Sequence, residues 1–131
     1  MIYIFLALWL ATGAATFFAR SRRAVHLLCA LHMGIHALFA ARLLFGGAFL
    51  ATSGAFFTFD EAGTVFYILM IVVAAFVFLH SQEYLRDDGI AAYRTYFALL
   101  MLLITAITGV YFANNIAVTW ILLETTTLCG A

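Results

Sequence analysis

The chain has 131 residues, of which 67% are hydrophobic and 9% are charged, and its formal net charge is zero. Its mean hydropathy is +1.13, and it contains no proline. A soluble domain of this size does not need so much apolar surface, so the composition predicts a membrane protein whose solvent is the lipid bilayer. The balanced charge provides no basic field for nucleic acid, and we therefore expect no nucleic-acid partner.

Five apolar runs predict an all-α membrane protein, a single domain over residues 1–131 with about five transmembrane helices. A helix needs about 17–25 predominantly apolar residues to cross the hydrocarbon core. The first four runs have roughly this length, whereas the fifth is shorter. The runs cover approximately residues 1–19, 24–45, 61–80, 95–113 and 116–131.

The arginines predict how these helices are oriented. Successive spans alternate in direction, so the connections after the first and third runs lie on the same side of the membrane. By the positive-inside rule that side is cytoplasmic and the N-terminus is outside. Positive charge also follows the first run instead of preceding it, which indicates a retained span and not a signal peptide. We expect a multi-pass protein of a prokaryotic inner membrane. The arginines of the two connections are Arg20, Arg22, Arg23, Arg86 and Arg94.

The connection between the second and third runs, residues 46–60, predicts a short hairpin on the outer side. Thr52, Ser53 and Gly54 form its expected tip. Asp60 then stands at the N-cap position of the third run, where its carboxylate complements the positive end of a helix. Residues 81–89 indicate a frayed helix end followed by a turn.

Glu124 is the candidate functional residue, because no other acidic or basic side chain follows Arg94. If Asn114 and Asn115 mark the water boundary, Glu124 lies about 13 Å deeper, near the midplane of a hydrocarbon core about 30 Å thick. An ionisable group there costs about 2.5–3.5 kcal/mol on insertion scales, which favours a role in proton or ion movement. Thr127, one turn further, offers a hydroxyl that can hold water beside the carboxylate. The alternative is a neutral glutamic acid that is hydrogen-bonded to a neighbouring helix.

His32 and His36 are further candidates for a proton or ion pathway. They are one helical turn apart and therefore share a face of the second run. Intramembrane histidines can relay protons, ligate haem or hydrogen-bond between helices, and a structural or water-binding role is the commoner use. A small b-type cytochrome using either histidine is therefore an alternative. No motif identifies a cofactor or a metal site, and we expect none.

A carboxylate that carries protons needs a basic partner within several ångströms, and this chain does not provide one. It contains no lysine, and the arginines of its cytoplasmic connections lie at another depth. We therefore expect another polypeptide to supply the cation opposite Glu124 and to complete the short fifth span. The alternative is a remnant that no longer pumps.

Several segments resemble a known family. Residues 114–120 (NNIAVTW) and 124–128 (ETTTL) closely resemble the fifth helix of membrane subunits from hydrogenases of the formate hydrogenlyase type. Residues 59–60, 66–69 and 80–84 are similar to the third-helix region of antiporter-like subunits, which occur in respiratory complex I and in multisubunit cation/proton antiporters. The resemblance covers residues 56–131, and the first two runs agree with the family in placement and orientation.

The resemblance implies a non-catalytic membrane subunit of an oxidoreductase complex that translocates protons or sodium ions while redox chemistry occurs elsewhere. The family pairs the glutamate at the position of Glu124 with a lysine on a later helix, within inverted helical repeats. This chain lacks the later helices, so we expect an N-terminal portion of such a subunit. Its expected partners are other membrane subunits, one of which supplies the lysine. A structural or assembly fragment without transport is the remaining alternative.

Overall fold

Five α-helices make up the chain in the computed structural model, which describes residues 2–46 and 56–130. They are α1 (Ile2–Phe17), α2 (Arg22–Phe45), α3 (Glu61–Tyr84), α4 (Ile90–Phe112) and α5 (Ile116–Gly130). No strand occurs within the described ranges, which confirms the predicted all-helical fold. α2, α3 and α4 are long and apolar enough to cross a membrane, whereas α1 and α5 are shorter apolar helices.

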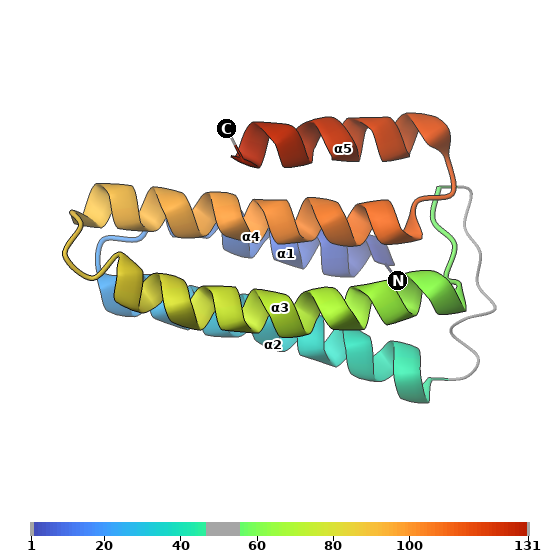
Figure 1. Ribbon diagram of the computed structural model, residues 1–131, viewed down its shortest axis with the longest axis horizontal. Helices are drawn as coiled ribbons and strands as arrows, with labels where there is room; N and C mark the ends of the chain where they lie inside the picture. Colours follow the sequence, from blue (N-terminus) through green and yellow to red (C-terminus); the bar gives the residue numbers. More distant parts are fainter. Residues whose placement is uncertain (1, 47–55, 131) are drawn as a thin grey trace.

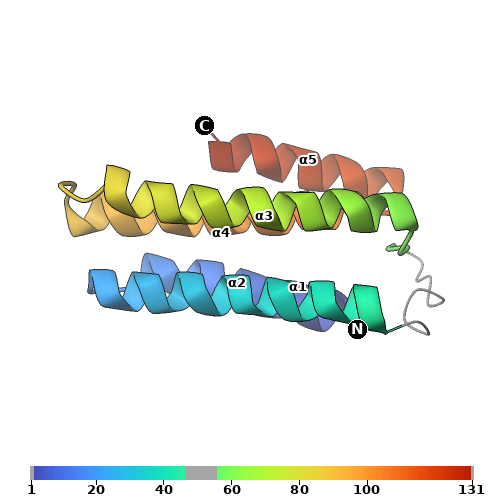
Figure 2. The same ribbon diagram turned by 60° about the horizontal axis from the view of Figure 1, so that its bottom comes forward.

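The helices run side by side along one axis, and each is antiparallel to the next in the chain (Figure 1). α1 and α2 form one layer, and α3 and α4 form the other (Figure 2). α4 is the central helix, because it contacts α1, α2, α3 and α5. α5 packs on α4 alone, so one side of it is covered by the bundle and the other is not.

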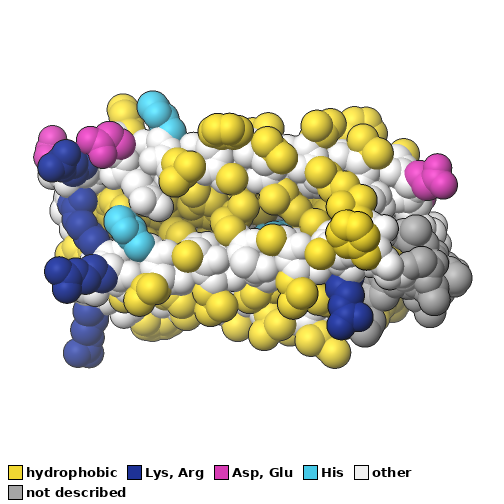
Figure 3. Space-filling view, turned by 90° about the horizontal axis from the view of Figure 1, so that it is seen from below, with side chains coloured by type: hydrophobic (Ala, Val, Ile, Leu, Met, Phe, Trp, Pro, Cys, Tyr) yellow, Lys and Arg dark blue, Asp and Glu magenta, His cyan; other side chains and the backbone are white. Residues whose placement is uncertain are grey.

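Arg22 joins the two arginine-containing connections at one end of the bundle. Its Nη1 donates to the carbonyl oxygen of Leu85 at 3.4 Å, and its Nη2 donates to the carbonyl oxygen of Asp88. The face seen in Figure 3 has hydrophobic side chains over its middle, with most of its Lys and Arg side chains gathered at this same end. An apolar belt between charged ends is the surface that a bilayer requires.

α4 begins at Ile90 and not near residue 95, as the sequence suggested, because its first polar residues have partners inside the bundle. The Arg22 guanidinium lies 4.6 Å from the centre of the Tyr93 ring, a cation–π contact. Arg94 Nη1 donates to the carbonyl oxygen of Ala19 at 3.5 Å. These contacts stabilise residues 90–94 as the first turn of α4, although the sequence predicts a polar connection there. α3 likewise continues beyond its predicted end at residue 80.

The predicted outer hairpin falls largely on residues 47–55, which lie outside the described residues, as do Thr52, Ser53 and Gly54. Its second arm pairs with the connection between α4 and α5. Thr58 N–H donates to the carbonyl oxygen of Phe112, and Asn114 N–H donates to that of Phe56, both at 2.8 Å. Asp60 caps α3 as predicted, because its Oδ1 accepts from Gly63 N–H at 2.9 Å.

Gly63 provides a test of this cap and of the packing beside it. A Cβ at Gly63 would lie 2.5 Å from Asp60 Oδ1 and 2.7 Å from the carbonyl oxygen of Tyr111. Gly63→Ala should therefore lower the free energy of unfolding in mixed micelles by more than about 1 kcal/mol, the value of a lost cap.

The matched control is Gly34→Ala. Gly34 lies in the middle of α2, and nothing lies within 4 Å of a Cβ built there. Alanine is a better helix former than glycine by roughly 0.5–1 kcal/mol, so this variant should be unchanged or more stable. Equal effects of the two substitutions would contradict the packing of α3 against the end of α4.

Candidate functional site

The buried face of α2 carries two histidines between two apolar layers. Its buried residues recur every three or four positions, in the order Val25, Cys29, His32, His36, Phe39 and Leu43. Val25 and Cys29 belong to one hydrophobic cluster with α3 and α4, and Phe39 and Leu43 belong to a second one. His32 and His36 therefore occupy the centre of the helix, where both side chains are fully buried.

His32 is held from α1. Its Nδ1 lies 2.7 Å from the hydroxyl oxygen of Thr12. The Thr12 hydroxyl in turn donates to the carbonyl oxygen of Trp9 at 2.9 Å. His32 thus has one ring nitrogen engaged, by a residue that is itself buried.

His36 is held from α1 and α3 together. The Trp9 indole stacks on its ring, with centroids 4.1 Å apart and an interplanar angle of 7°. Its Nδ1 lies 2.9 Å from Tyr67 Oη, which also donates to the carbonyl oxygen of His36 at 3.1 Å. The rings of His32 and His36 meet edge to face, with centroids 4.8 Å apart.

We call these five residues, Trp9, Thr12, His32, His36 and Tyr67, the histidine cluster. The sequence predicted the shared face of the two histidines but missed the three residues that surround them. Three of the cluster's buried nitrogens have no hydrogen-bond partner: Trp9 Nε1, His32 Nε2 and His36 Nε2. Buried polar atoms without partners are uncommon, because leaving one unsatisfied costs about 1–3 kcal/mol.

Glu124 lies on the outer face of α5. Leu122 packs against Gly109 of α4, since a Cβ at that glycine would lie 2.8 Å from Leu122 Cδ1. Glu124 follows two residues later, about 200° further around the helix at roughly 100° per residue. Its side chain is exposed, and no residue of α5 is buried. Glu124 is therefore not buried within its own chain.

The level of Glu124 along the bundle follows from its neighbours. Leu123 and Thr127 line a cavity of about 440 Å³ together with Leu103 and Ile107 of the C-terminal half of α4. Glu124 therefore lies level with the C-terminal half of a helix that is long enough to span a membrane, and inside the ends of that helix. Thr127, predicted to hold water beside the carboxylate, is exposed, and its hydroxyl donates to the carbonyl oxygen of Glu124 at 2.7 Å.

The four predicted site residues form two groups. The structure brings His32 and His36 together, but it separates them from Glu124 and Thr127. The histidine cluster joins α1, α2 and α3, whereas the helix contacts of α5 are with α4. Within the described ranges the one ion pair is Arg86–Glu83, exposed at the arginine-rich end, so Glu124 has no cation there.

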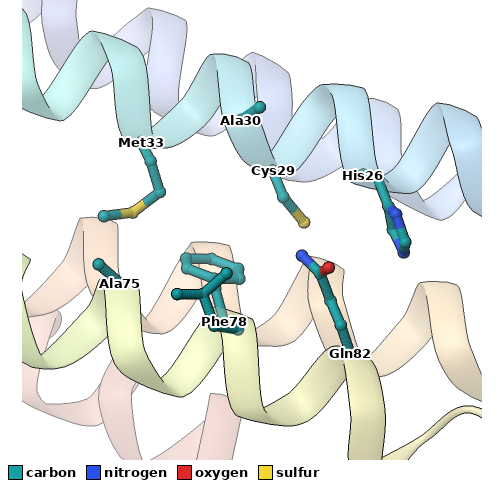
Figure 4. Close-up of a pocket in the computed structure, with 8 residues that line it drawn as sticks. His26, Cys29, Ala30, Met33, Ala75, Phe78 and Gln82 are labelled. Carbon is teal, nitrogen blue, oxygen red and sulfur yellow. The ribbon is translucent and has the colours of Figure 1, made fainter.

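A third polar location is a cavity of about 260 Å³ between α2 and α3 (Figure 4). Cys29 and Gln82 point toward one another across it, and His26 lies at one end. His26 Nε2 is engaged at 2.6 Å with Tyr93 Oη. Across the described parts of the chain, no three metal-ligating residues of the His, Cys, Asp or Glu type come together. The cavity therefore offers a thiol and an amide, but no metal centre.

The alternative of a b-type cytochrome that uses either His32 or His36 stays a prediction. The geometry excludes only that both histidines ligate the same haem. The two rings come from adjacent turns of one helix and touch edge to face at 4.8 Å between centroids. Axial histidines instead approach the iron from opposite faces of a porphyrin, which has to lie between them.

Comparisons of the chain with protein-family models, curated proteins and solved structures found no match.

Thr12 offers a direct test of the histidine cluster. Thr12→Val keeps the shape of the side chain but removes the oxygen that accepts from His32, which leaves a buried donor unsatisfied. We expect the free energy of unfolding to fall by about 1–3 kcal/mol. Thr12→Ser should retain most of the stability. Thr95→Val is the control, because Thr95 is exposed and its hydroxyl bonds only its own helix. Equal losses in the Thr12→Val and Thr95→Val variants would contradict the assigned hydrogen bond.

Proposed function

We propose that this chain is a membrane subunit of a complex I-like or membrane-bound hydrogenase/antiporter assembly. In this proposal Glu124 takes part in coupled translocation of protons, or of sodium ions linked to them. The observation that carries the proposal is an ionisable, exposed carboxyl on an apolar helix, level with the C-terminal half of the spanning-length helix α4. The resemblance of residues 114–120 and 124–128 to the antiporter-like subunits supports the same assignment.

The surroundings of Glu124 support a partner chain. Apart from Thr127 its helix face is apolar, and a carboxyl group facing lipid near the centre of a bilayer costs about 2.5–3.5 kcal/mol even on insertion scales. A neighbouring membrane subunit that covers this face can remove that cost by placing a basic group, a lysine in our proposal, beside the carboxylate. Exposed apolar residues of the same helix are Ile116, Trp120, Ile121, Leu123 and Leu128.

The mechanism we propose uses two states of Glu124. When the neighbouring cation is close, the carboxylate is ionised and paired. When the cation withdraws, the desolvated carboxylate takes up a proton, because burial in a medium of low dielectric disfavours its charged form. Repeating this exchange as the partner moves would carry protons past the midplane. The redox reaction that drives the movement occurs on other subunits.

The membrane arrangement is part of the same proposal. All five helices cross the membrane, with the short α1 and α5 completed by lipid adaptation or by the partner. The arginine-rich connections that Arg22 joins face the cytoplasm of a prokaryotic cell, which places the N-terminus outside.

A structural role is the second candidate. The outer face of α5 is uncovered and largely apolar. Such a face can bind a neighbouring subunit and fill a helical layer without moving any ion. On this reading Glu124 serves as a neutral hydrogen-bond donor, and transport is carried out by other chains.

Substitutions at Glu124 separate the two candidates. Glu124→Gln keeps the size and hydrogen bonding of a neutral glutamic acid but cannot exchange a proton. We expect the complex to assemble and its coupled ion translocation in proteoliposomes to fall at least tenfold. Glu124→Leu should be equally inactive in translocation.

Glu83→Gln is the matched control, because Glu83 is an exposed acid at the connection between α3 and α4. That variant should pump normally. Full pumping by Glu124→Gln and Glu124→Leu, with intact assembly, would contradict the ion-carrying role and leave the structural one.

A further inference from the structure

The hydrogen bonds of the histidine cluster fix the tautomer of His32. A threonine hydroxyl has one proton, and that of Thr12 is donated to the carbonyl oxygen of Trp9. The contact between Thr12 Oγ1 and His32 Nδ1 at 2.7 Å must then be donated by the histidine. A neutral imidazole has one N–H, so His32 carries it on Nδ1, and its buried Nε2 presents a lone pair.

The same reasoning applies to His36. The phenol proton of Tyr67 is donated to the carbonyl oxygen of His36 at 3.1 Å. His36 Nδ1 must therefore donate to Tyr67 Oη at 2.9 Å, and its Nε2 is also a buried lone pair. The two histidines thus share one tautomer, each held from a different neighbouring helix.

Both rings are neutral in this environment, because no counter-charge faces them. All six acidic residues of the chain are exposed, at helix ends or on the outer face of α5: Asp60, Glu61, Glu83, Asp87, Asp88 and Glu124. α1 contributes Trp9 and Thr12 to the cluster, and α3 contributes the Tyr67 phenol. The buried polar residues of α4 are Thr105 and Thr108, whose hydroxyls donate to their own helix. An imidazolium in this site would have no partner of opposite charge.

We propose that the histidine cluster is an internal water site. Water supplies the two kinds of group that the cluster needs: protons for the lone pairs of His32 Nε2 and His36 Nε2, and an oxygen for the Trp9 Nε1–H. The three atoms belong to side chains that are fully buried, and the ring of His36 contacts those of both Trp9 and His32. The inference does not rest on the function proposed for Glu124.

A metal cation fits the same atoms less well. Two imidazole nitrogens whose N–H groups are held by second partners are arranged as in many metal sites. However, among the described residues no third His, Cys, Asp or Glu side chain joins them to complete a metal site, and the Trp9 N–H is a donor that cannot bind a cation. A neutral ligand that both donates and accepts is therefore the better match.

The site places exchangeable protons at the centre of an apolar bundle. Along α2 its two histidines lie between Cys29 of one hydrophobic cluster and Phe39 of the other, and its Trp9 and Tyr67 belong to the second cluster. Water held by two imidazole lone pairs forms a polar step between Cys29 and Phe39, without any fixed charge.

The test is magic-angle-spinning NMR of the full chain in lipid bilayers with ¹⁵N-labelled histidine. His32 and His36 should show a protonated Nδ1, a bare Nε2, and magnetisation transfer from water protons to the ring. In the Tyr67→Phe variant His36 should show a mixture of the two neutral tautomers, whereas the spectrum of His32 should be unchanged. Tyr84→Phe is the control, because Tyr84 is highly exposed on the surface of α3.

Three other results of this experiment would contradict the proposal. An Nε2–H tautomer or an imidazolium at neutral pH would show that the assigned hydrogen bonds are wrong. The assigned tautomers without any transfer from water would show a dry site. A shift of both Nε2 signals on adding Zn²⁺ or Cu⁺ at stoichiometric amounts would show a metal site instead.

Discussion

A carboxyl group on the uncovered side of α5 is the constraint on which our account of this chain depends. Within the described residues Glu124 has neither a cation nor a buried position, although the group lies level with the C-terminal half of α4 and inside its ends. In lipid such a group is either neutral or paired with a charge from outside. The outer face of α5 is largely apolar, and we therefore propose that a neighbouring subunit binds this face and covers Glu124. The proposed function follows from what that subunit has to contribute.

The histidine cluster also places polar groups in an apolar bundle, but it does so in the interior of the chain. Its polar groups come from α1, α2 and α3, and most of them find partners within the chain. Glu124 does not belong to this site, because the histidine cluster joins α1, α2 and α3 whereas α5 packs on α4. The bundle therefore holds an internal polar site built by three of its own helices and a surface carboxyl that, in our proposal, another chain covers.

Much of the fold is predictable from the sequence, because the length of an apolar run acts locally. Asp60 is recognisable as a cap for the same reason. The start of α4 is not predictable from local sequence. Tyr93 and Arg94 are held in the helix by contacts with Arg22 and Ala19, which are distant from them in the sequence. Periodicity placed His32 and His36 on one face, but it carries no information on which helices cover that face. The exposure of Glu124 could not be predicted from the sequence either, because it depends on which side of α5 packs against α4.

The most direct measurement is a structure of the assembly extracted intact from its native membrane, at a resolution that shows side chains around Glu124. The account predicts a basic nitrogen of a neighbouring subunit within about 4 Å of the carboxylate, the limit for an ion pair, or one ordered water away. Acyl chains packed directly against Glu124, or bulk water with no basic group nearby, would contradict it.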